Sequence, residues 1–301
     1  MLCARAGALA LLLALLPARA RHRTYEDRPP SERPFFLPAL ESSDEAVNYA
    51  RGDRLSEAMF ATLGKLLGRM QRDRSLFDRR LLARFGRGAP PGGGYALQER
   101  HYAVVEGALD GALVATLARF YADLIDAGAL PFGDGQSRRF QAHNEKLSRV
   151  LHFDLEPLVS RLVGVPVKAT YSYFGGYVNG SSLPLHTDKP ACEYTVSLCL
   201  AREPADAPWP ILVQKKAEPC VSCGGPKAHA PRADEMAALD WPPGGFGIFK
   251  GRHHSHMRDA FDGVHARYLL LHYVPVDEAA HAAHVAKFAR NCSACEIREP
   301  G

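Results

Sequence analysis

The chain has 301 residues, of which 47% are hydrophobic, so it can bury a substantial core. Its formal net charge is +4 at pH 7, and the lysines and arginines are interspersed with acids rather than gathered in one stripe. This pattern argues against a nucleic-acid-binding protein, which needs a basic surface. The length favours one core domain with an added helical region.

The first twenty residues have the pattern of a secretory signal peptide. Arg5 precedes an apolar run over residues 7–16, and Ala18-Arg19-Ala20 supplies the small residues of a cleavage site. At about ten residues the run is too short to cross a membrane, and no second stretch approaches the roughly twenty residues required. We expect the secretory pathway, and therefore a periplasmic or extracellular protein. A retained alanine-rich helix or an organelle transit peptide, with a cytoplasmic or organellar location, is the alternative.

Residues 21–44 combine prolines with mixed charges and indicate a linker or surface arm. Residues 45–165 have helical periodicity, with a first helix after Asp53 and a second one that carries Val105 and the apolar positions up to Leu124. A third helix is expected from Asn144. Pro157 is expected to divide it, because proline lacks the backbone N–H that a helix interior uses.

From residue 166 onward the expected secondary structure changes to strands. Short segments rich in β-branched and aromatic residues are separated by Gly, Pro and Asn. They cover residues 167–174, 193–200, 209–213, 247–250 and 267–274. Because helices do not separate these strands, a sandwich or barrel is favoured over a parallel sheet. Residues 166–276 are the expected core, and residues 277–301 are expected to form a last helix and a cysteine-containing tail.

His186-Thr187-Asp188 is the first candidate metal-binding pair. In an extended chain, residues two apart point to the same side, so the imidazole and the carboxylate can meet one ion. Two histidines and one carboxylate on one face of an octahedral ion leave the opposite positions open, as an iron(II) oxygenase requires. A third ligand must then come from farther along the chain.

The surrounding spacing makes the signal more specific. Tyr177-Val178-Asn179-Gly180 places a tyrosine nine residues before His186, and His256 is followed eleven residues later by Arg267. Together, these motifs resemble the prolyl 4-hydroxylase branch of the 2-oxoglutarate and iron(II) dioxygenases over about residues 167–274. The resemblance implies an α+β fold, a double-stranded β-helix or jelly roll with the helical region packed on it.

The resemblance also implies roles for individual residues. His186, Asp188 and His256 would bind iron(II), Arg267 would hold the distal carboxylate of 2-oxoglutarate, and Tyr177 would donate a hydrogen bond to it. The implied activity uses dioxygen to hydroxylate a C–H bond of a peptidyl or amino-acid-like substrate and releases succinate and carbon dioxide. Ascorbate is a further candidate cofactor.

Arg267 suits this role on chemical grounds as well. A guanidinium is permanently charged and can bind a carboxylate through two hydrogen bonds. Arg267 lies on the same face of its strand as Leu269, Leu271 and Tyr273, and we expect this face to point into the barrel.

Two neighbouring histidines compete with His256 for the third ligand position. Only His256 has the eleven-residue interval to Arg267, so His253 and His254 are expected to be exposed loop residues near the site. Arg258 could face the pocket or pair with a nearby aspartate. His265 and His272 are expected to be structural.

Seven cysteines are present. Cys192 and Cys199 are expected to be small buried residues of the core. The remaining candidates form two Cys-x-x-Cys pairs, Cys220 with Cys223 and Cys292 with Cys295. Disulfides, a structural zinc site or free thiols all remain open for these pairs. Glycosylation sequons occur at Asn179 and Asn291.

Two other function classes remain open on the sequence. One is a non-catalytic jelly-roll module that binds a ligand or a partner, and the other is a cupin-like metalloenzyme that does not use 2-oxoglutarate. A fixed cation beside the metal would distinguish the proposed oxygenase from both. The sequence does not identify a substrate or an oligomeric state.

Overall fold

The computed structural model describes residues 100–276, apart from residues 135, 190 and 218–230, together with the single residues Lys65, Phe77 and Leu97. The predictions for the signal peptide, the linker, the first helix as a whole, the last helix and both Cys-x-x-Cys pairs lie outside the described residues. Neither of the described α-helices combines the length and apolar character needed to span a membrane.

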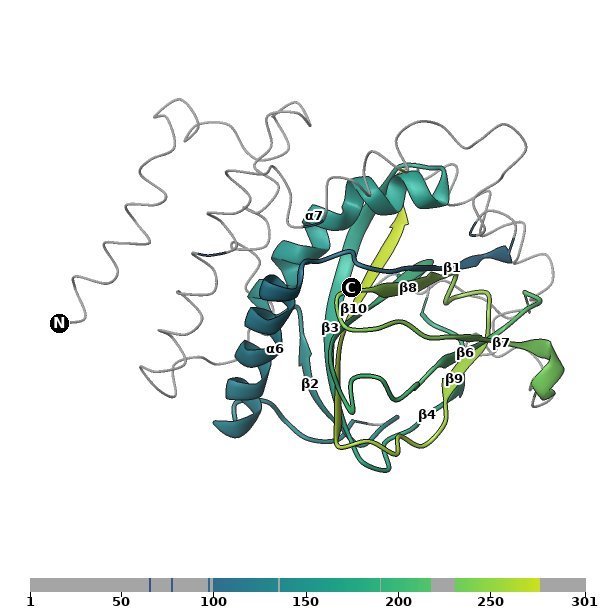
Figure 1. The fold of residues 1–301 in the computed structure, drawn as a ribbon. Helices are drawn as coiled ribbons and strands as arrows, with labels where there is room; N and C mark the ends of the chain where they lie inside the picture. Colours follow the sequence, from purple (N-terminus) through teal and green to yellow (C-terminus); the bar gives the residue numbers. More distant parts are fainter. Residues whose placement is uncertain are drawn as a thin grey trace, which may run out of the picture.

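Two antiparallel β-sheets face each other in the described chain (Figure 1). The larger sheet has the strand order β1-β8-β5-β10-β3-β2, and the smaller has the order β4-β9-β6-β7. The strands are β1 Tyr102–Val105, β2 Arg139–His143, β3 Val167–Val178, β4 Leu183–His186, β5 Tyr194–Glu203, β6 Ile211–Gln214, β7 Met236–Leu239, β8 Phe246–Phe249, β9 His256–Arg258 and β10 His265–Pro275. This arrangement is consistent with the predicted jelly roll.

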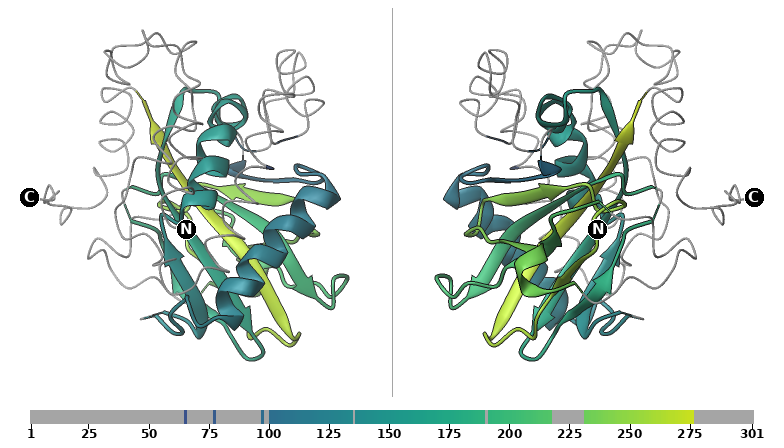
Figure 2. Two further views of the ribbon diagram at one scale, coloured as in Figure 1. Left: turned by 90° about the vertical axis from the view of Figure 1, so that its left-hand side faces the viewer. Right: turned by 90° about the vertical axis from the view of Figure 1, so that its right-hand side faces the viewer.

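Two helices, α6 (Gly111–Asp126) and α7 (Lys146–Val163), cover the outer face of the larger sheet (Figure 2). Helix α6 packs on β5, and α7 packs on β3 and β10. Each helix begins at an acidic residue whose carboxylate accepts hydrogen bonds from backbone N–H groups of the first turn, Asp110 for α6 and Glu145 for α7. A short 3-10 helix, η6 (Ala233–Glu235), precedes β7.

The helical prediction for residues 100–165 needs three corrections. Val105 lies in β1, paired with Phe246 of β8, and α6 begins only after the left-handed Gly107 has turned the chain. Residues 139–143 form β2, because the chain between the helices pairs with β3. Pro157 lies inside one continuous helix α7. Pro157 lies on the exposed side of the helix, and its missing N–H leaves one carbonyl group of the preceding turn without its helical partner.

The predicted strands are confirmed, with longer bounds for several of them. In β5 and β10 almost every residue is buried, because both faces of these strands are covered. Along β10, one face belongs to the core that the sheet shares with α6 and α7, and the other lines the space between the two sheets. The helix-facing side chains are Leu269, Leu271 and Tyr273, and the inner ones are Tyr268, Leu270 and His272.

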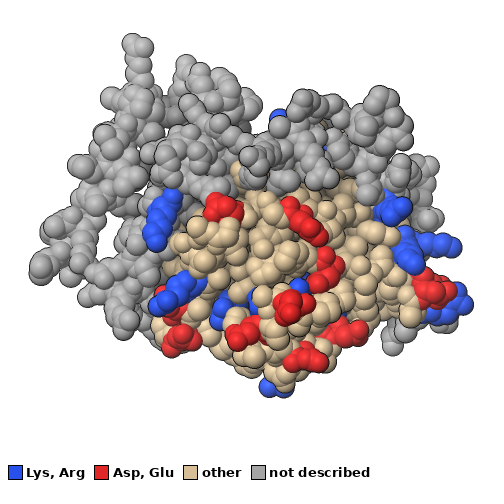
Figure 3. Space-filling view, in the orientation of Figure 1, with Lys and Arg blue, Asp and Glu red and all other residues tan. Residues whose placement is uncertain are grey.

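Charged side chains on the face shown in Figure 3 are mixed in sign. Acidic groups lie over its middle and lower part, and most lysines and arginines lie toward its flanks (Figure 3). No continuous basic surface crosses this face of the described residues.

Glu156 of α7 gives the fold a pH-dependent contribution. Its Oε1 accepts a hydrogen bond from the backbone N–H of Ala169 at 2.7 Å, and burial raises the pKa of the carboxyl group from 4.5 to about 7. The folded chain therefore holds this proton to a higher pH than the unfolded chain does. Stability from this group is present below about pH 4.5 and is lost as the pH rises through 7.

We expect Glu156→Gln to be more stable than the wild type at pH 8 but not at pH 5, because glutamine keeps the acceptor oxygen and cannot ionise. Denaturant midpoints at the two pH values measure the difference. The exposed Glu106→Gln is the matched control. An equal shift at both pH values for Glu156→Gln would contradict this account.

Candidate metal centre

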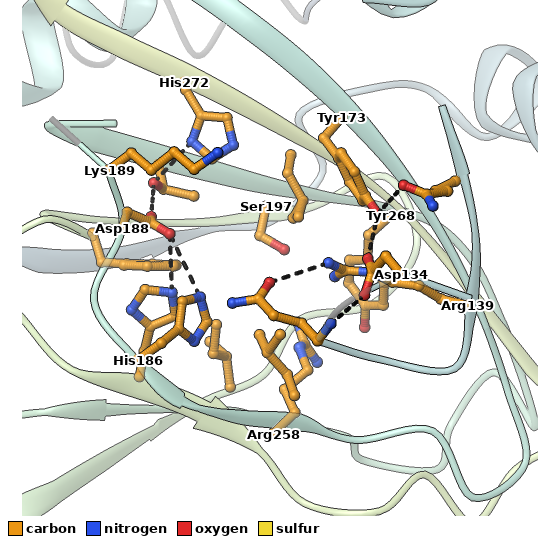
Figure 4. A pocket seen from close by; sticks show the side chains of 18 of the residues that line it. Asp134, Arg139, Tyr173, His186, Asp188, Lys189, Ser197, Arg258, Tyr268 and His272 are labelled. Atoms are coloured by element: carbon orange, nitrogen blue, oxygen red, sulfur yellow. Dashed lines mark hydrogen bonds and ion pairs between the residues drawn. The ribbon is translucent and has the colours of Figure 1, made fainter. Parts of the chain in front are cut away.

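A cavity of about 460 Å³ lies between the two sheets. Side chains from β2, β3, β5 and β10 of the larger sheet and from β4, β6 and β9 of the smaller one line it (Figure 4). The triad that the sequence predicted, His186, Asp188 and His256, lies at one end. The candidate side chains are thus brought together from β4, the loop after it and β9.

The two histidines are cross-strand partners. His186 of β4 pairs with His256 of β9, and their ring centroids are 4.3 Å apart. Both Nε2 atoms lie 3.6 Å from Oδ1 of Asp188. The potential ligand atoms of this group all lie within 4.8 Å of one another, a spacing that a single ion can span.

The other ring nitrogens are already engaged. Nδ1 of His186 donates to the carbonyl of Pro184 at 2.8 Å, and Nδ1 of His256 donates to the carbonyl of His254 at 2.9 Å. A backbone carbonyl can only accept, so both rings carry a proton on Nδ1, and Nε2 is the nitrogen that faces the centre. Such contacts orient imidazoles that bind metals.

Asp188 is fixed by its surroundings. Its backbone N–H donates to the carbonyl of Gly251 at 2.9 Å, and its Oδ2 accepts from the hydroxyl of Thr195 at 2.6 Å. Burial raises the pKa of Asp188, but the charge of His256 and contacts from His186 and His256 outweigh burial and hold the pKa well below its ordinary value. The carboxylate is therefore ionised and available to a cation.

A second group in the described chain, Asp188, Cys192 and His272, also has its possible ligand atoms within 4.8 Å of one another. Burial raises the pKa of the Cys192 thiol to about 12, and the Tyr171 hydroxyl lies 3.1 Å from its sulfur. Burial lowers the pKa of His272 to about 4, so its ring is neutral at neutral pH. Cys192 and Cys199 are both buried and free, as predicted.

The orientation predicted for Arg267 is wrong. Arg267 shares a face with Leu269 as expected, but this face packs on the helices. Its strand partner Gly176 faces Ile125 of α6, and its own Nη1 contacts Nε2 of His265 at 3.1 Å. Of the described residues of β10, those that line the cavity are Tyr268, Leu270 and His272.

Arg258, two residues after His256 on β9, faces the cavity instead. Its guanidinium lies 4.5 Å from the ring centroid of Trp209 and 4.4 Å from that of Tyr268, and Nη1 donates to the carbonyl of Trp209. The side chain is 3% exposed. Among the described residues, no carboxylate forms an ion pair with it. Of the two alternatives that the sequence left open for Arg258, the structure has the side chain facing the pocket.

A second buried arginine, Arg139 of β2, has an acidic partner. Its Nε donates to Asp134 at 2.7 Å, and its Nη1 donates to the hydroxyl oxygen of Tyr177 at 2.6 Å. The Tyr173 hydroxyl also donates to Asp134, at 2.5 Å. Burial raises the pKa of Asp134, but Tyr173 and Arg139 outweigh it and lower the pKa to about 2. The charge of Arg139 is thus balanced inside the cavity wall.

His253 and His254 are buried, which corrects their expected exposure. The turn between β8 and β9 folds inward, where His253 Nε2 lies 2.8 Å from Oε2 of Glu193. His254 contacts the carbonyl of Gln214 at 2.7 Å and Nδ1 of His101 at 2.9 Å. These partners are distant in sequence, so the local loop pattern could not reveal them. His265 contacts Arg267 as a structural residue, whereas His272 lines the cavity.

Comparison with known proteins identifies similar folds only. No family model matches the chain, and no curated protein matches it. Similar solved structures include a Pseudomonas putida prolyl-4-hydroxylase, with 13% identity and a TM-score of 0.46 over 65% of this chain and 100% of that one.

Another is SnoK, a non-heme alpha-ketoglutarate-dependent carbocyclase from nogalamycin biosynthesis, with 15% identity and a TM-score of 0.47 over 72% and 96% of the two chains. A third is a Trichoplax adhaerens prolyl hydroxylase in complex with a hypoxia inducible factor peptide fragment, with 14% identity and a TM-score of 0.42 over 62% and 89%. Many of the similar structures are 2-oxoglutarate and iron(II) oxygenases, the class that the sequence motifs resemble. At these values the chemistry must be argued from the side chains.

The carboxylate of Asp188 can occupy its position only because residue 251 is a glycine. A Cβ atom at this position would lie 2.0 Å from Oδ2 of Asp188 and 2.7 Å from Oγ1 of Thr195. We expect Gly251→Ala to displace the carboxylate and to weaken Mn²⁺ binding by about tenfold or more, measured by titration. Gly111→Ala, where a Cβ meets nothing within 4 Å, is the control. Equal affinity of the two variants would show that the carboxylate does not depend on Gly251.

Proposed function

We propose that this chain is an iron(II)- and 2-oxoglutarate-dependent dioxygenase that hydroxylates a C–H bond and releases succinate and carbon dioxide. One juxtaposition carries the proposal. Two histidines and a carboxylate converge at one end of a cavity, and a buried arginine without an acidic partner among the described residues lines the same cavity. The first feature fits a metal, and the second fits an anion bound beside it.

The donor set fits iron(II). His186 and His256 offer two imidazole nitrogens, and Asp188 offers one carboxylate oxygen. Two histidines and one carboxylate leave open positions on the ion for a cosubstrate and dioxygen. When bound, the iron and the cosubstrate would supply the oxidising power that the side chains of this cavity lack.

Arg258 fits the far carboxylate of a dicarboxylic acid. A guanidinium buried without a counter-ion is costly, and a bound carboxylate removes that cost through two charge-assisted hydrogen bonds. Residues two apart on a strand lie about 6.6 Å apart, so His256 and Arg258 present a ligand and a cation at neighbouring points of one face. A five-carbon dicarboxylate is long enough to join two such points.

Tyr177 can donate a hydrogen bond to the same carboxylate that Arg258 would bind. Its oxygen accepts from Arg139, which leaves its own hydroxyl proton free to donate to a ligand. This arrangement supports the role that the sequence resemblance implied for Tyr177, with Arg258 in the place foreseen for Arg267. The proposal extends to a peptidyl or amino-acid-like substrate, and entry into the secretory pathway is its suggested setting.

The two arginines provide a matched test. We expect Arg258→Gln to raise the concentration of 2-oxoglutarate needed for half-saturation by about tenfold or more, because a desolvated charge pair is lost. Arg267→Gln should change it by less than about threefold, since Arg267 lies on the helix side. The visible charge-transfer band that forms when 2-oxoglutarate chelates iron(II), titrated without oxygen, is the measurement. A wild-type protein that binds iron but shows no band would refute the cosubstrate assignment.

The three neighbouring histidines provide the second test. His256→Ala should abolish stoichiometric iron(II) binding, because His256 is the one of these three histidines whose Nε2 faces Asp188. His253→Ala and His254→Ala should retain one bound iron and lower the free energy of unfolding, because each removes a buried hydrogen bond. Metal analysis and denaturant unfolding separate the two effects. Retained stoichiometry in His256→Ala would exclude the proposed triad.

A further inference from the structure

Asp188 belongs to a chain of hydrogen bonds that reaches away from the proposed iron. Its Oδ1 faces His186 and His256, whereas its Oδ2 accepts from Thr195 at 2.6 Å. The Thr195 hydroxyl lies in turn 3.1 Å from Nδ1 of His272. Figure 4 shows His272 and Asp188 on the same side of the cavity, with the dashed contacts leading from one to the other.

The direction of each hydrogen bond follows from a count of protons. An ionised carboxylate can only accept, so the single hydroxyl proton of Thr195 points to Asp188. Thr195 must then accept from His272, and Nδ1 of His272 must carry a proton. His272 therefore prevents the Thr195 hydroxyl from rotating away from the carboxylate.

The alternative use of these residues is a second metal site formed by Asp188, Cys192 and His272. The Thr195 hydroxyl lies within hydrogen-bond distance of both Asp188 and His272. It already bridges one oxygen of Asp188 and one nitrogen of His272, two of the residues that such an ion would have to join. The same geometry thus favours a hydrogen-bond relay over a sulfur-containing metal site.

We propose that Thr195 and His272 are positioning residues that restrict Asp188 to binding the metal through one oxygen. This inference rests on the proposed function and adds a mechanism for it. Oδ2 is held by the hydroxyl of Thr195, and the absence of a side chain on Gly251 leaves room for this arrangement. Oδ1 alone is presented to the two histidines.

The number of Asp188 oxygens that bind the metal decides how many coordination positions of the metal stay open. A carboxylate that binds through both oxygens occupies a position that a chelating cosubstrate or dioxygen would need. Loss of the Thr195 hydroxyl removes the side-chain donor to Oδ2, so a metal held by Oδ1 could also bind Oδ2. Thr195→Val should therefore bind metal about as well as the wild type but with both oxygens, and it should react more slowly with dioxygen.

The experiment compares the wild type with Thr195→Val and Thr195→Ser. Thr116→Val, at a half-buried threonine of α6 whose hydroxyl bonds within its own helix, is the matched control. Crystal structures of the Mn²⁺-loaded proteins show how many Asp188 oxygens contact the ion, and Mn²⁺ titration gives the affinity. The rate at which dioxygen bleaches the iron and 2-oxoglutarate band is the kinetic readout.

We expect two contacting oxygens and a bleaching rate about tenfold lower or more in Thr195→Val, with Mn²⁺ affinity within about threefold of the wild type. Thr195→Ser should behave like the wild type because it restores the hydroxyl, and Thr116→Val should be unchanged. A single contacting oxygen in Thr195→Val, or a Thr195→Ser variant as impaired as Thr195→Val, would overturn the inference.

The second group can be tested by loading the wild type with Co²⁺. A sulfur-to-cobalt charge-transfer band that is lost in Cys192→Ser would show that this group binds a metal and would also overturn the inference. A wild type without the chelate band would refute the proposed function, and the Mn²⁺ structures would still decide the role of Thr195.

Discussion

The carboxylate of Asp188 is the point at which the separate parts of this fold meet. Its backbone bonds to the β8–β9 turn, its Oδ2 bonds to β5 through Thr195, and its Oδ1 faces histidines from β4 and β9. A buried charge with so many partners has one favourable position. The triad therefore depends on the pairing of His186 with His256 within the smaller sheet and on the hydrogen bond from Thr195, which joins Asp188 to the larger sheet.

The two buried arginines that line the cavity have different partners, and this difference affects what each of them can bind. Arg139 forms an ion pair with Asp134 and donates a hydrogen bond to Tyr177 in the lining of the cavity. Arg258 is held by the rings of Trp209 and Tyr268 and by a backbone carbonyl, which orient the guanidinium without cancelling its charge. A structural arginine needs a counter-ion within the protein, whereas a ligand-binding arginine must keep its charge for the ligand.

The sequence predicted what depends on local pattern. The strands and the extended His-x-Asp pair follow from alternation, the choice of His256 follows from the interval that the family resemblance implies, and the structure brings the three side chains together. Arg267 was assigned to the wrong side because both faces of β10 are apolar, so periodicity groups residues by face but does not say which face the helices cover. The burial of His253 depends on Glu193, sixty residues earlier, and no local signal reports such a contact.

The same two-sided strands explain why the site is rigid. Along β5, Val196 and Leu198 pack in the core shared with the helices, while Thr195 and Ser197 line the cavity. Along β10, Leu271 and Tyr273 pack in that core, and His272 between them points to Thr195. A side chain on one face of a strand cannot shift without moving its neighbours on the other. The helix-covered core therefore holds the hydrogen-bond relay in register, and the orientation of Asp188 depends on packing as much as on its own hydrogen bonds.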